Sequence, residues 1–263
     1  MGNYVITGSA SGIGAATRAL VEADGHTVIG VDLLDAEIEA DLSTADGRAG
    51  AVAAAVEQSG GVLDGLVTSA GVGPPFDPHK MLTINWFGTE CFLSGLHDAL
   101  VASESIAKVV AISSNSTTCG GPIPSSVVDA CIAMDEAGAH TALDELGDMA
   151  MHIAYAGAKT AVARFVRRHA PTEQWAGSGI RLNAIAPGAT LTPLLQGGLD
   201  DPQFGELIRA FTVPTGDFGT PDQIGSWVHH MLSPAADFMA GTLLFVDGGT
   251  DAMMNADRWP ETS

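Results

Sequence analysis

The stretch that decides the fold of this chain is Thr7-Gly8-Ser9-Ala10-Ser11-Gly12-Ile13-Gly14. It joins a strand-like apolar run, residues 4–7, to a helix-like segment, residues 13–24. Gly8 lets the chain turn sharply, Gly12 lets the backbone approach a pyrophosphate, and Gly14 lets the helix pack tightly against the strand. The helix N-terminus adds free N–H groups and a partial positive charge. The turn therefore predicts a dinucleotide site rather than a purely structural glycine-rich loop.

A single acidic residue refines this prediction. Asp32 follows the second strand-like run, residues 27–31, where a carboxylate can accept hydrogen bonds from the adenosine ribose hydroxyls. The same carboxylate would repel a 2′-phosphate, and Leu33 stands beside it where a phosphate-binding Arg would help. We therefore expect NAD rather than NADP as the cofactor. The alternative is a solvated Asp at a strand end that has no part in binding.

Strand-like and helix-like segments alternate along the whole chain, and several of the strand-like runs are almost wholly apolar, as strands covered on both faces are. This alternation predicts an α/β fold with one doubly wound parallel sheet of the Rossmann type, in a single domain over residues 1–263. The expected strands are 4–7, 27–31, 63–69, 108–113, 180–186 and 243–246, and the expected helices are 13–24, 45–59, 81–103, 154–169 and 221–232.

Two long connections interrupt the alternation. Residues 115–150 form an insert rich in Gly, Pro, Ser and Asp, with helical patches around 125–138 and 141–149. Residues 190–219 carry many apolar side chains, which we expect to form a flexible flap over a hydrophobic substrate. The alternative is that they pack a short pair of helices against the domain. These side chains are Leu191, Leu194, Leu195, Leu199, Phe204, Leu207, Ile208 and Phe211.

The composition disfavours several classes of protein. Of the 263 residues, 46% are hydrophobic and 16% are charged, which excludes a disordered chain. A formal net charge of −20 argues against nucleic acid and anionic membranes as partners. No apolar run could span a bilayer and the N-terminus does not read as a signal peptide, so we expect a cytoplasmic protein. The three cysteines lack metal-ligand spacing and His229-His230 has no evident partner ligands, so we expect no metal site.

Further motifs follow the glycine turn in order. They are Asp41-Leu42, Ser69-Ala70-Gly71, Asn85, Ser113-Ser114, Tyr155-Ala156-Gly157-Ala158-Lys159, Pro187-Gly188 with Thr190 and Thr192, and Val246-Asp247-Gly248-Gly249. In this order they resemble the motifs of the short-chain dehydrogenase/reductase family over nearly the whole chain. The spacing Thr-Gly-x-x-x-Gly-x-Gly and the pair Tyr-x-x-x-Lys are the family's signatures. Ser69 is a departure, because the family usually has Asn at that position.

The resemblance implies an oxidoreductase that moves a hydride between a nicotinamide cofactor and an alcohol or ketone. Tyr155 would act as general acid and base, and Lys159, one helical turn away, would lower its pKa and hold the nicotinamide ribose. Ser114 would orient the substrate oxygen, with Ser113 structural, and Asn85 would support a water that relays protons, unless it only packs its helix. The implied NAD-binding residues are Gly8, Ser11, Gly12, Ile13, Gly14, Asp32, Leu33, Asp41, Leu42, Ser69, Ala70, Gly71, Tyr155, Lys159, Pro187, Gly188, Thr190 and Thr192.

The number of residues between Ser114 and Tyr155 points to one subgroup of the family. Ser114 and Tyr155 are 41 residues apart, a much longer gap than most members of the family have. This gap is similar to that of a bacterial subgroup that acts on 3α-hydroxysteroids and xenobiotic carbonyl compounds, which implies a hydrophobic secondary alcohol or ketone as substrate. Many relatives assemble through the helix that bears the Tyr. In the subgroup the insert covers that surface, so we expect a homodimer through another face, which could include residues 115–150.

Two other functions stay open. One is a non-catalytic NAD-binding sensor built on the same fold, against which the presence of Ser114, Tyr155 and Lys159 together argues. The other is an acyl-carrier-protein ketoreductase, which would favour NADPH and a basic docking patch. Asp32 and the scarcity of Lys and Arg argue against it.

Overall fold

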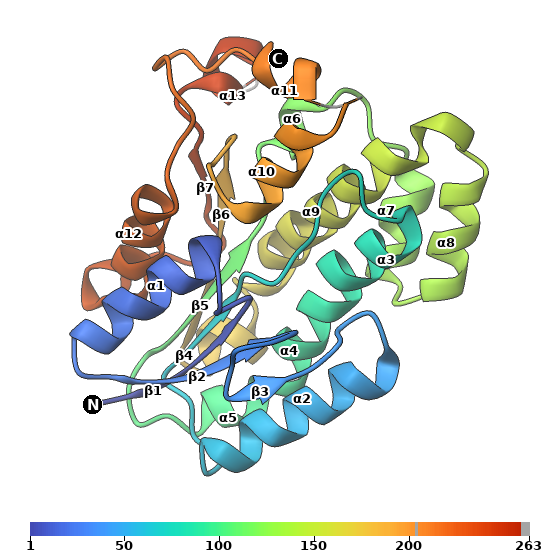
Figure 1. Ribbon diagram of the computed structural model, residues 1–263. Helices are drawn as coiled ribbons and strands as arrows, with labels where there is room; N and C mark the ends of the chain where they lie inside the picture. Colours follow the sequence, from blue (N-terminus) through green and yellow to red (C-terminus); the bar gives the residue numbers. More distant parts are fainter. Residues whose placement is uncertain (203–204, 259–263) are drawn as a thin grey trace.

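A parallel sheet of seven strands is the middle layer of the part of the chain that the computed structural model describes, residues 1–202 and 205–258 (Figure 1). Phe204 of the expected flap lies outside the described residues. The strand order is β3-β2-β1-β4-β5-β6-β7, and neighbouring strands run parallel, which confirms the predicted doubly wound sheet. The strands are β1 (Asn3–Thr7), β2 (Thr27–Asp32), β3 (Ile38–Glu39), β4 (Gly65–Thr68), β5 (Ala107–Ile112), β6 (Ile180–Pro187) and β7 (Leu243–Val246).

Helices cover both faces of the sheet (Figure 1). Successive residues of β1 feed two separate cores: Val5 belongs to one, and Tyr4 and Ile6 belong to the other. This alternation explains why the inner strands read as continuous apolar runs. On one face lie α1 (Gly12–Ala23) and α12 (Pro221–Leu232), and on the other lie α2 (Ala45–Gln58), α4 (Thr89–Gly95) and α9 (Ala150–His169).

The strand order reverses between β1 and β4. From β1 the chain first proceeds to β2 and β3, and it then returns to β4 on the opposite side of β1. In a doubly wound sheet such a reversal opens a crevice at the carboxyl ends of the strands. The glycine turn lies at the carboxyl end of β1 and Ser69 at that of β4, so the topology brings two of the predicted motifs to one place.

The prediction of one continuous helix over residues 81–103 is wrong. The segment is divided into α3 (Pro78–Leu82), a π-helical stretch η1 (Thr83–Gly88), α4 and α5 (His97–Val101). At Leu96 the backbone leaves the helical region, with φ −100° and ψ 2°, and this follows directly on Gly95. Glycine weakens a helix and π-helical turns are local insertions, so neither break disturbs the overall apolar periodicity from which one helix was expected.

The insert between Ser114 and Tyr155 forms a helical layer of its own. The expected patch 125–138 is interrupted at Met134, whose φ is 58°, and Asp135 then caps the next helix by accepting a hydrogen bond from the N–H of Gly138 at 2.9 Å. Helix α9 begins four residues before the expected position 154. The elements of the insert are α6 (Ser116–Cys119), α7 (Ser125–Ile132), α8 (Glu136–Asp144) and the 3-10 turn η2 (Gly147–Met149).

Polar contacts fasten this insert to the main body of the protein. Glu136 of α8 pairs with Arg48 of α2 at 2.7 Å and accepts a hydrogen bond from the Thr83 hydroxyl at 2.8 Å. Arg48 also donates to the carbonyl oxygen of Leu42 at 3.3 Å. Trp86, which is buried, donates from its indole N–H to the Cys131 carbonyl oxygen at 2.7 Å. The insert is therefore linked both to the α3–α4 region and to the predicted NAD-binding residue Leu42.

The cysteines Cys91, Cys119 and Cys131 are free thiols. Across residues 1–202 and 205–258, none of the helices is both long and apolar enough to cross a membrane. The remaining short elements are η3 (Glu173–Gly177), α10 (Pro193–Asp200), α11 (Gly205–Arg209), η4 (Pro234–Ala236) and α13 (Thr250–Met254).

Candidate active site

A cavity of about 790 Å³ lies at the carboxyl ends of the strands. It extends from Asp32 at the end of β2 to Tyr155 on α9, so it spans the predicted cofactor and catalytic positions. Two of the predicted residues, Gly14 and Asn85, do not line it. The predicted residues that line it are Gly8, Ser11, Gly12, Ile13, Asp32, Leu33, Asp41, Leu42, Ser69, Ala70, Gly71, Ser114, Tyr155, Lys159, Pro187, Gly188, Thr190 and Thr192.

The glycine turn has the geometry of a cradle that side chains would fill. Gly8 and Gly12 have φ values of 67° and 54°, in the left-handed region that favours glycine. A Cβ on Gly8 would lie 2.7 Å from the backbone nitrogen of Ala70, and a Cβ on Gly14 would overlap the Gly8 carbonyl oxygen. The first turn of α1 contains no acidic residue, so its N–H groups can attract a pyrophosphate. The turn therefore fits the phosphates of a dinucleotide.

Asp32 joins the glycine turn to the segment after β2 on the side of the cavity where adenosine is expected. Its carboxylate accepts hydrogen bonds from the N–H of Ala10 at 2.9 Å and the N–H of Leu33 at 2.7 Å. These contacts hold an oxygen-rich edge next to the glycine turn and fix its orientation. A carboxylate held there can still accept hydrogen bonds from a diol, because each oxygen has a second lone pair.

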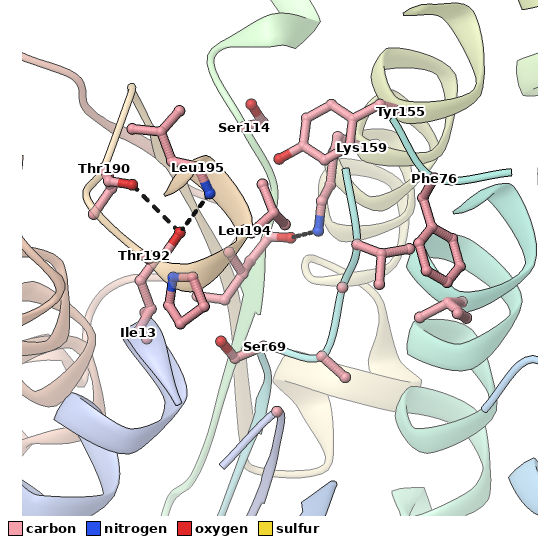
Figure 2. A pocket seen from close by; sticks show the side chains of 18 of the residues that line it. Ile13, Ser69, Phe76, Ser114, Tyr155, Lys159, Thr190, Thr192, Leu194 and Leu195 are labelled. Atoms are coloured by element: carbon pink, nitrogen blue, oxygen red, sulfur yellow. Dashed lines mark hydrogen bonds between the residues drawn. The ribbon is translucent and has the colours of Figure 1, made fainter. Parts of the chain in front are cut away.

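Asp41 and Leu42 form the neighbouring wall. The hydrogen bonds from Ser43, and then the positive charge of Lys80, lower the pKa of the Asp41 carboxyl. On the opposite side, the Thr7 hydroxyl accepts a hydrogen bond from the N–H of Ala70 at 3.0 Å and so positions the segment after β4. Ser69 lines the cavity, so its departure from the family pattern leaves a polar side chain at this place (Figure 2).

The predicted catalytic residues come together at the other end of the cavity. Tyr155 and Lys159 lie on one face of α9. Ser114 follows β5, and its hydroxyl is close enough to Tyr155 to lower the pKa of the phenol (Figure 2). The Ser114 hydroxyl accepts a hydrogen bond from the N–H of Ser116 at 3.1 Å, so its own hydrogen remains available for donation. Lys159 Nζ donates to the Ile112 carbonyl oxygen at 2.9 Å and lies 5.9 Å from the centre of the Tyr155 ring.

Burial shifts the pKa values of this pair in opposite directions and so moves them apart. Burial raises the pKa of Tyr155, and the Ser114 hydrogen bond opposes that rise. Burial lowers the pKa of Lys159 to about 8. Both shifts have the same cause, because the charged form of either group loses hydration in this site. A perturbed Tyr–Lys pair that adjoins a cavity is typical of proton-transfer sites.

Comparison with known proteins identifies the family. A family model described as Enoyl-(Acyl carrier protein) reductase matches residues 8–251. The 3-alpha-hydroxysteroid dehydrogenase/carbonyl reductase of Comamonas testosteroni is 41% identical over 260 residues, which cover 98% of this chain and 100% of that protein. This chain belongs to the short-chain dehydrogenase/reductase family. It is an oxidoreductase that acts on CH–OH groups.

Two more similarities define its place among the short-chain dehydrogenases. The crystal structure of the 3-alpha-hydroxysteroid dehydrogenase from Pseudomonas sp. B-0831, complexed with NADH, superimposes with a TM-score of 0.91 at 45% identity and covers 97% of this chain and 98% of that one. The cis-4-hydroxycyclohexanecarboxylate dehydrogenase of Sinomonas cyclohexanicum is 30% identical and covers 95% of this chain and 96% of that protein. The predicted likeness to the hydroxysteroid subgroup of short-chain dehydrogenases is confirmed.

Asn85 lies next to the site without lining the cavity. Its side-chain oxygen accepts a hydrogen bond from the N–H of Val72 at 2.9 Å, and its Nδ2 donates to the Val72 carbonyl oxygen at 2.8 Å. The amide therefore shapes the segment after β4, and support of a proton-relaying water stays a prediction. Ser113 donates to the Lys159 carbonyl oxygen at 2.9 Å and is buried, as the structural role expected for it requires.

The connection 190–219 contains two short helices, α10 and α11, that border the cavity. Thr192 caps α10 by accepting a hydrogen bond from the N–H of Leu195 at 3.3 Å, and its methyl carbon lies 3.2 Å from the Cβ position of Gly12 (Figure 2). This connection thus begins against the glycine turn. Of its expected apolar side chains, those that line the cavity are Leu194, Leu195, Leu207, Ile208 and Phe211.

Two cavity residues in the loop after β4 escaped the sequence analysis. Pro74 and Phe76 follow β4 and line the cavity opposite α10, and Leu194 Cδ2 lies 2.9 Å from the Cβ position of Gly73 (Figure 2). Their signal in the sequence is a Gly-Pro-Pro-Phe turn, which indicates a loop and not a wall. His152, one turn before Tyr155, also lines the cavity. The described residues include no group of three or more His, Cys, Asp or Glu side chains that could hold a metal ion.

The Ser114 hydrogen bond leads to a pH-dependent prediction. Oxidation of an alcohol needs the Tyr155 phenolate, so the rate rises with pH through the apparent pKa of this group. Ser114→Ala removes the contact that lowers the Tyr155 pKa, so we expect the rising limb of the kcat/KM profile for alcohol oxidation to move to higher pH. Plateau activity should also fall about 10²-fold. Ser113→Ala is the matched control, and a limb that moves equally in both variants contradicts the assignment.

Proposed function

We propose that this protein transfers a hydride between NAD(H) and a hydrophobic secondary alcohol or ketone, with 3α-hydroxysteroids and xenobiotic carbonyl compounds as the substrate class. The observation that carries the proposal is the meeting of the Tyr155 and Ser114 hydroxyls in the same cavity that Asp32 and the glycine turn line. One end of the cavity suits a dinucleotide, and the other holds an acid–base pair under an apolar flap. Cofactor and carbonyl would therefore meet at Tyr155.

The residues that would hold NAD are the eighteen predicted above, of which Gly14 acts through the turn and not through the cavity. The bound nicotinamide supplies the hydride in reduction and accepts it in oxidation. Asp32 supports NAD over NADP, because its carboxylate suits a 2′-hydroxyl and repels a 2′-phosphate. The NADH complex of the Pseudomonas relative supports the same preference.

The side chains of the protein supply the proton chemistry. In reduction Tyr155 donates its proton to the carbonyl oxygen, and in oxidation its phenolate takes the hydroxyl proton. Ser114 donates a hydrogen bond to the same oxygen and keeps it within reach of Tyr155. Lys159, when charged, would offset the effect of burial on the Tyr155 pKa, and it would also hold the nicotinamide ribose hydroxyls. Asn85 would support the water through which Lys159 recovers its proton.

The apolar flap and the acidic surface support the substrate class. Leucine, isoleucine and phenylalanine side chains of the described part of residues 190–219 line the cavity, and the net charge of −20 disfavours phosphorylated or strongly acidic substrates. The names of the Comamonas and Pseudomonas relatives point to the same class. An acyl-carrier-protein ketoreductase would need a basic docking surface, and a non-catalytic sensor would not need Ser114, Tyr155 and Lys159 together.

Assembly and location are part of the same proposal. We infer a homodimer that does not use the Tyr-bearing face of α9, because α7 and α8 of the insert pack beside that helix. A tetramer through the α9 helices, seen by light scattering, would contradict it. The free thiols of the three cysteines fit a reducing compartment, and we propose the cytoplasm.

A ketone panel tests the proposed function. With NADH we expect a 3-ketosteroid to be reduced with a kcat/KM about 10²-fold above that of a ketose sugar or an acetoacetyl thioester, because only the steroid fills the apolar cavity. Leu194→Ala should lower the value for the steroid about tenfold and change the value for a small cyclic ketone much less. NADH binding without turnover of any ketone would favour the sensor, and preference for the thioester with NADPH would favour the ketoreductase.

A further inference from the structure

An arginine near the expected ribose site is held by two glutamates. Arg18 of α1 donates from Nη1 and Nη2 to the two carboxylate oxygens of Glu37, at 2.9 and 2.7 Å, and from Nε to Glu22 at 2.8 Å. The side chains of Arg18 and Glu37 are 24% and 39% exposed, so water reaches only part of the pair. The hydrogen bond raises the pKa of Arg18 and lowers that of Glu37, so both stay charged at neutral pH.

This pair lies against β2 two residues before Asp32. Glu37 Oε2 also accepts a hydrogen bond from the N–H of Gly30 at 2.8 Å, and Arg18 Nη1 lies 2.7 Å from the position that a Cβ of Gly30 would occupy. Residues two apart on a strand face the same side and are separated by about 7 Å. The guanidinium is therefore on the Asp32 side of β2, one strand repeat away from the expected 2′-position of the ribose.

The path from Arg18 to that position is short. Side chains on a helix lean towards its N-terminus, and for α1 this is the end where the phosphates are expected. Ser9 Oγ lies against the same Gly30 position, is buried, and makes no hydrogen bond within the described part of the chain. The pKa of the Asp41 carboxyl is lowered mainly by its hydrogen bonds from Ser43. Lys80, another cation at this end of the cavity, lowers this pKa further.

We propose that Glu37 is a residue that determines cofactor specificity, because it holds the Arg18 guanidinium away from the place where a 2′-phosphate would lie beside Asp32. The proposal rests on the proposed NAD(H) function and deepens it. Asp32 repels a 2′-phosphate directly, and Glu37 withholds the cation that could offset this repulsion. Loss of the Asp32 charge alone would then remove the repulsion of the 2′-phosphate without creating a site for it. Loss of the Asp32 and Glu37 charges together would create such a site.

Dissociation constants of NADH and NADPH, measured by titration calorimetry without substrate, test this role. The reference is Asp32→Ser. Adding Glu37→Gln keeps an acceptor for the Gly30 N–H but releases the charge of the pair, so we expect NADPH to bind about tenfold more tightly, the effect of one charge-assisted hydrogen bond. NADH affinity should stay close to that of the reference. The gain should shrink as the salt concentration rises, because the new contact is an exposed ion pair.

Two matched variants test whether Arg18 is the cause of the expected gain in NADPH affinity. Adding Arg18→Met to the double variant should abolish the NADPH gain. Using Glu22→Gln in place of Glu37→Gln should give no gain, because the two Glu37 hydrogen bonds still hold the guanidinium. An unchanged NADPH affinity in the double variant, or a gain that survives Arg18→Met, would overturn the proposal. Failure of the wild-type protein to bind NADH would contradict the proposed function instead, and the NADPH comparison among the variants would still report on Arg18.

Discussion

Tyr155→Phe should lower the turnover of a ketone by NADH about 10³-fold while the affinity for NADH changes little. The substitution removes one hydroxyl, so the ring and its packing on α9 remain and only the proton donor is lost. General acid catalysis by a positioned side chain contributes about 10²–10⁴-fold, and nothing else in the described site has an acidic hydroxyl next to a cation. Steady-state kcat and the NADH dissociation constant, measured on the same preparation, check both parts.

Tyr4→Phe is the matched control for this variant. Tyr4 is the other tyrosine of the chain, lies in the core of the α1–α12 face and does not line the large cavity. We expect Tyr4→Phe to keep its turnover. Full activity of Tyr155→Phe would exclude Tyr155 as the general acid, and equal losses in the two variants would indicate a general effect of removing a buried hydroxyl.

Gly14→Ala should weaken NADH binding about tenfold to a hundredfold, which corresponds to about 1.4–2.8 kcal/mol. The new Cβ would overlap the Gly8 carbonyl oxygen and lie 2.7 Å from its carbon. The glycine turn must therefore move away from α1, and the N–H groups that would face the pyrophosphate move with it. Overpacking of this kind costs about 1–3 kcal/mol, so the melting temperature should fall as well.

Gly50→Ala controls for the exchange of glycine for alanine in a helix. Gly50 is exposed on α2, and no atom outside its own helix turn lies within 4 Å of its Cβ position. We expect unchanged NADH affinity and a gain in stability of about 0.5–1 kcal/mol, because alanine restricts the unfolded chain. If Gly14→Ala binds NADH as tightly as Gly50→Ala does, the close approach of α1 to the glycine turn is not needed for cofactor binding.

Much of the fold and of the site could be predicted because the deciding contacts are local in sequence. The glycine turn, Asp32 at the end of β2 and the Tyr155–Lys159 pair each occupy a few consecutive residues or one helical turn. Parallel strands bring their carboxyl ends to one edge, so motifs that follow strands converge there without further information. Ser114 follows β5 and so lies at this edge, and α9 packs against β5 and β6 and brings Tyr155 to it, although 41 residues separate the two in the sequence.

The features that escaped prediction depend on contacts between distant segments. Phe76 lines a cavity that α10 closes by approaching the loop after β4 at Gly73, and Glu37 holds Arg18 across a separation of 19 residues. The interruption of the expected helix 81–103 is accompanied by the bond of Asn85 to Val72, a contact that the apolar periodicity does not encode. Such contacts depend on the tertiary arrangement, in which local propensity is a weak guide.

The fate of a deuterium label tests most directly whether this protein transfers hydride to a hydrophobic ketone. NADH deuterated at C4 on the transferred face is incubated with the purified protein and a 3-ketosteroid, and the product alcohol is examined by mass spectrometry and NMR. We predict one deuterium on the carbinol carbon, none exchanged from solvent at that carbon, and almost no labelled product with Tyr155→Phe. An unlabelled carbinol carbon, or NADH that stays bound and unreacted with every ketone, would contradict the proposed activity.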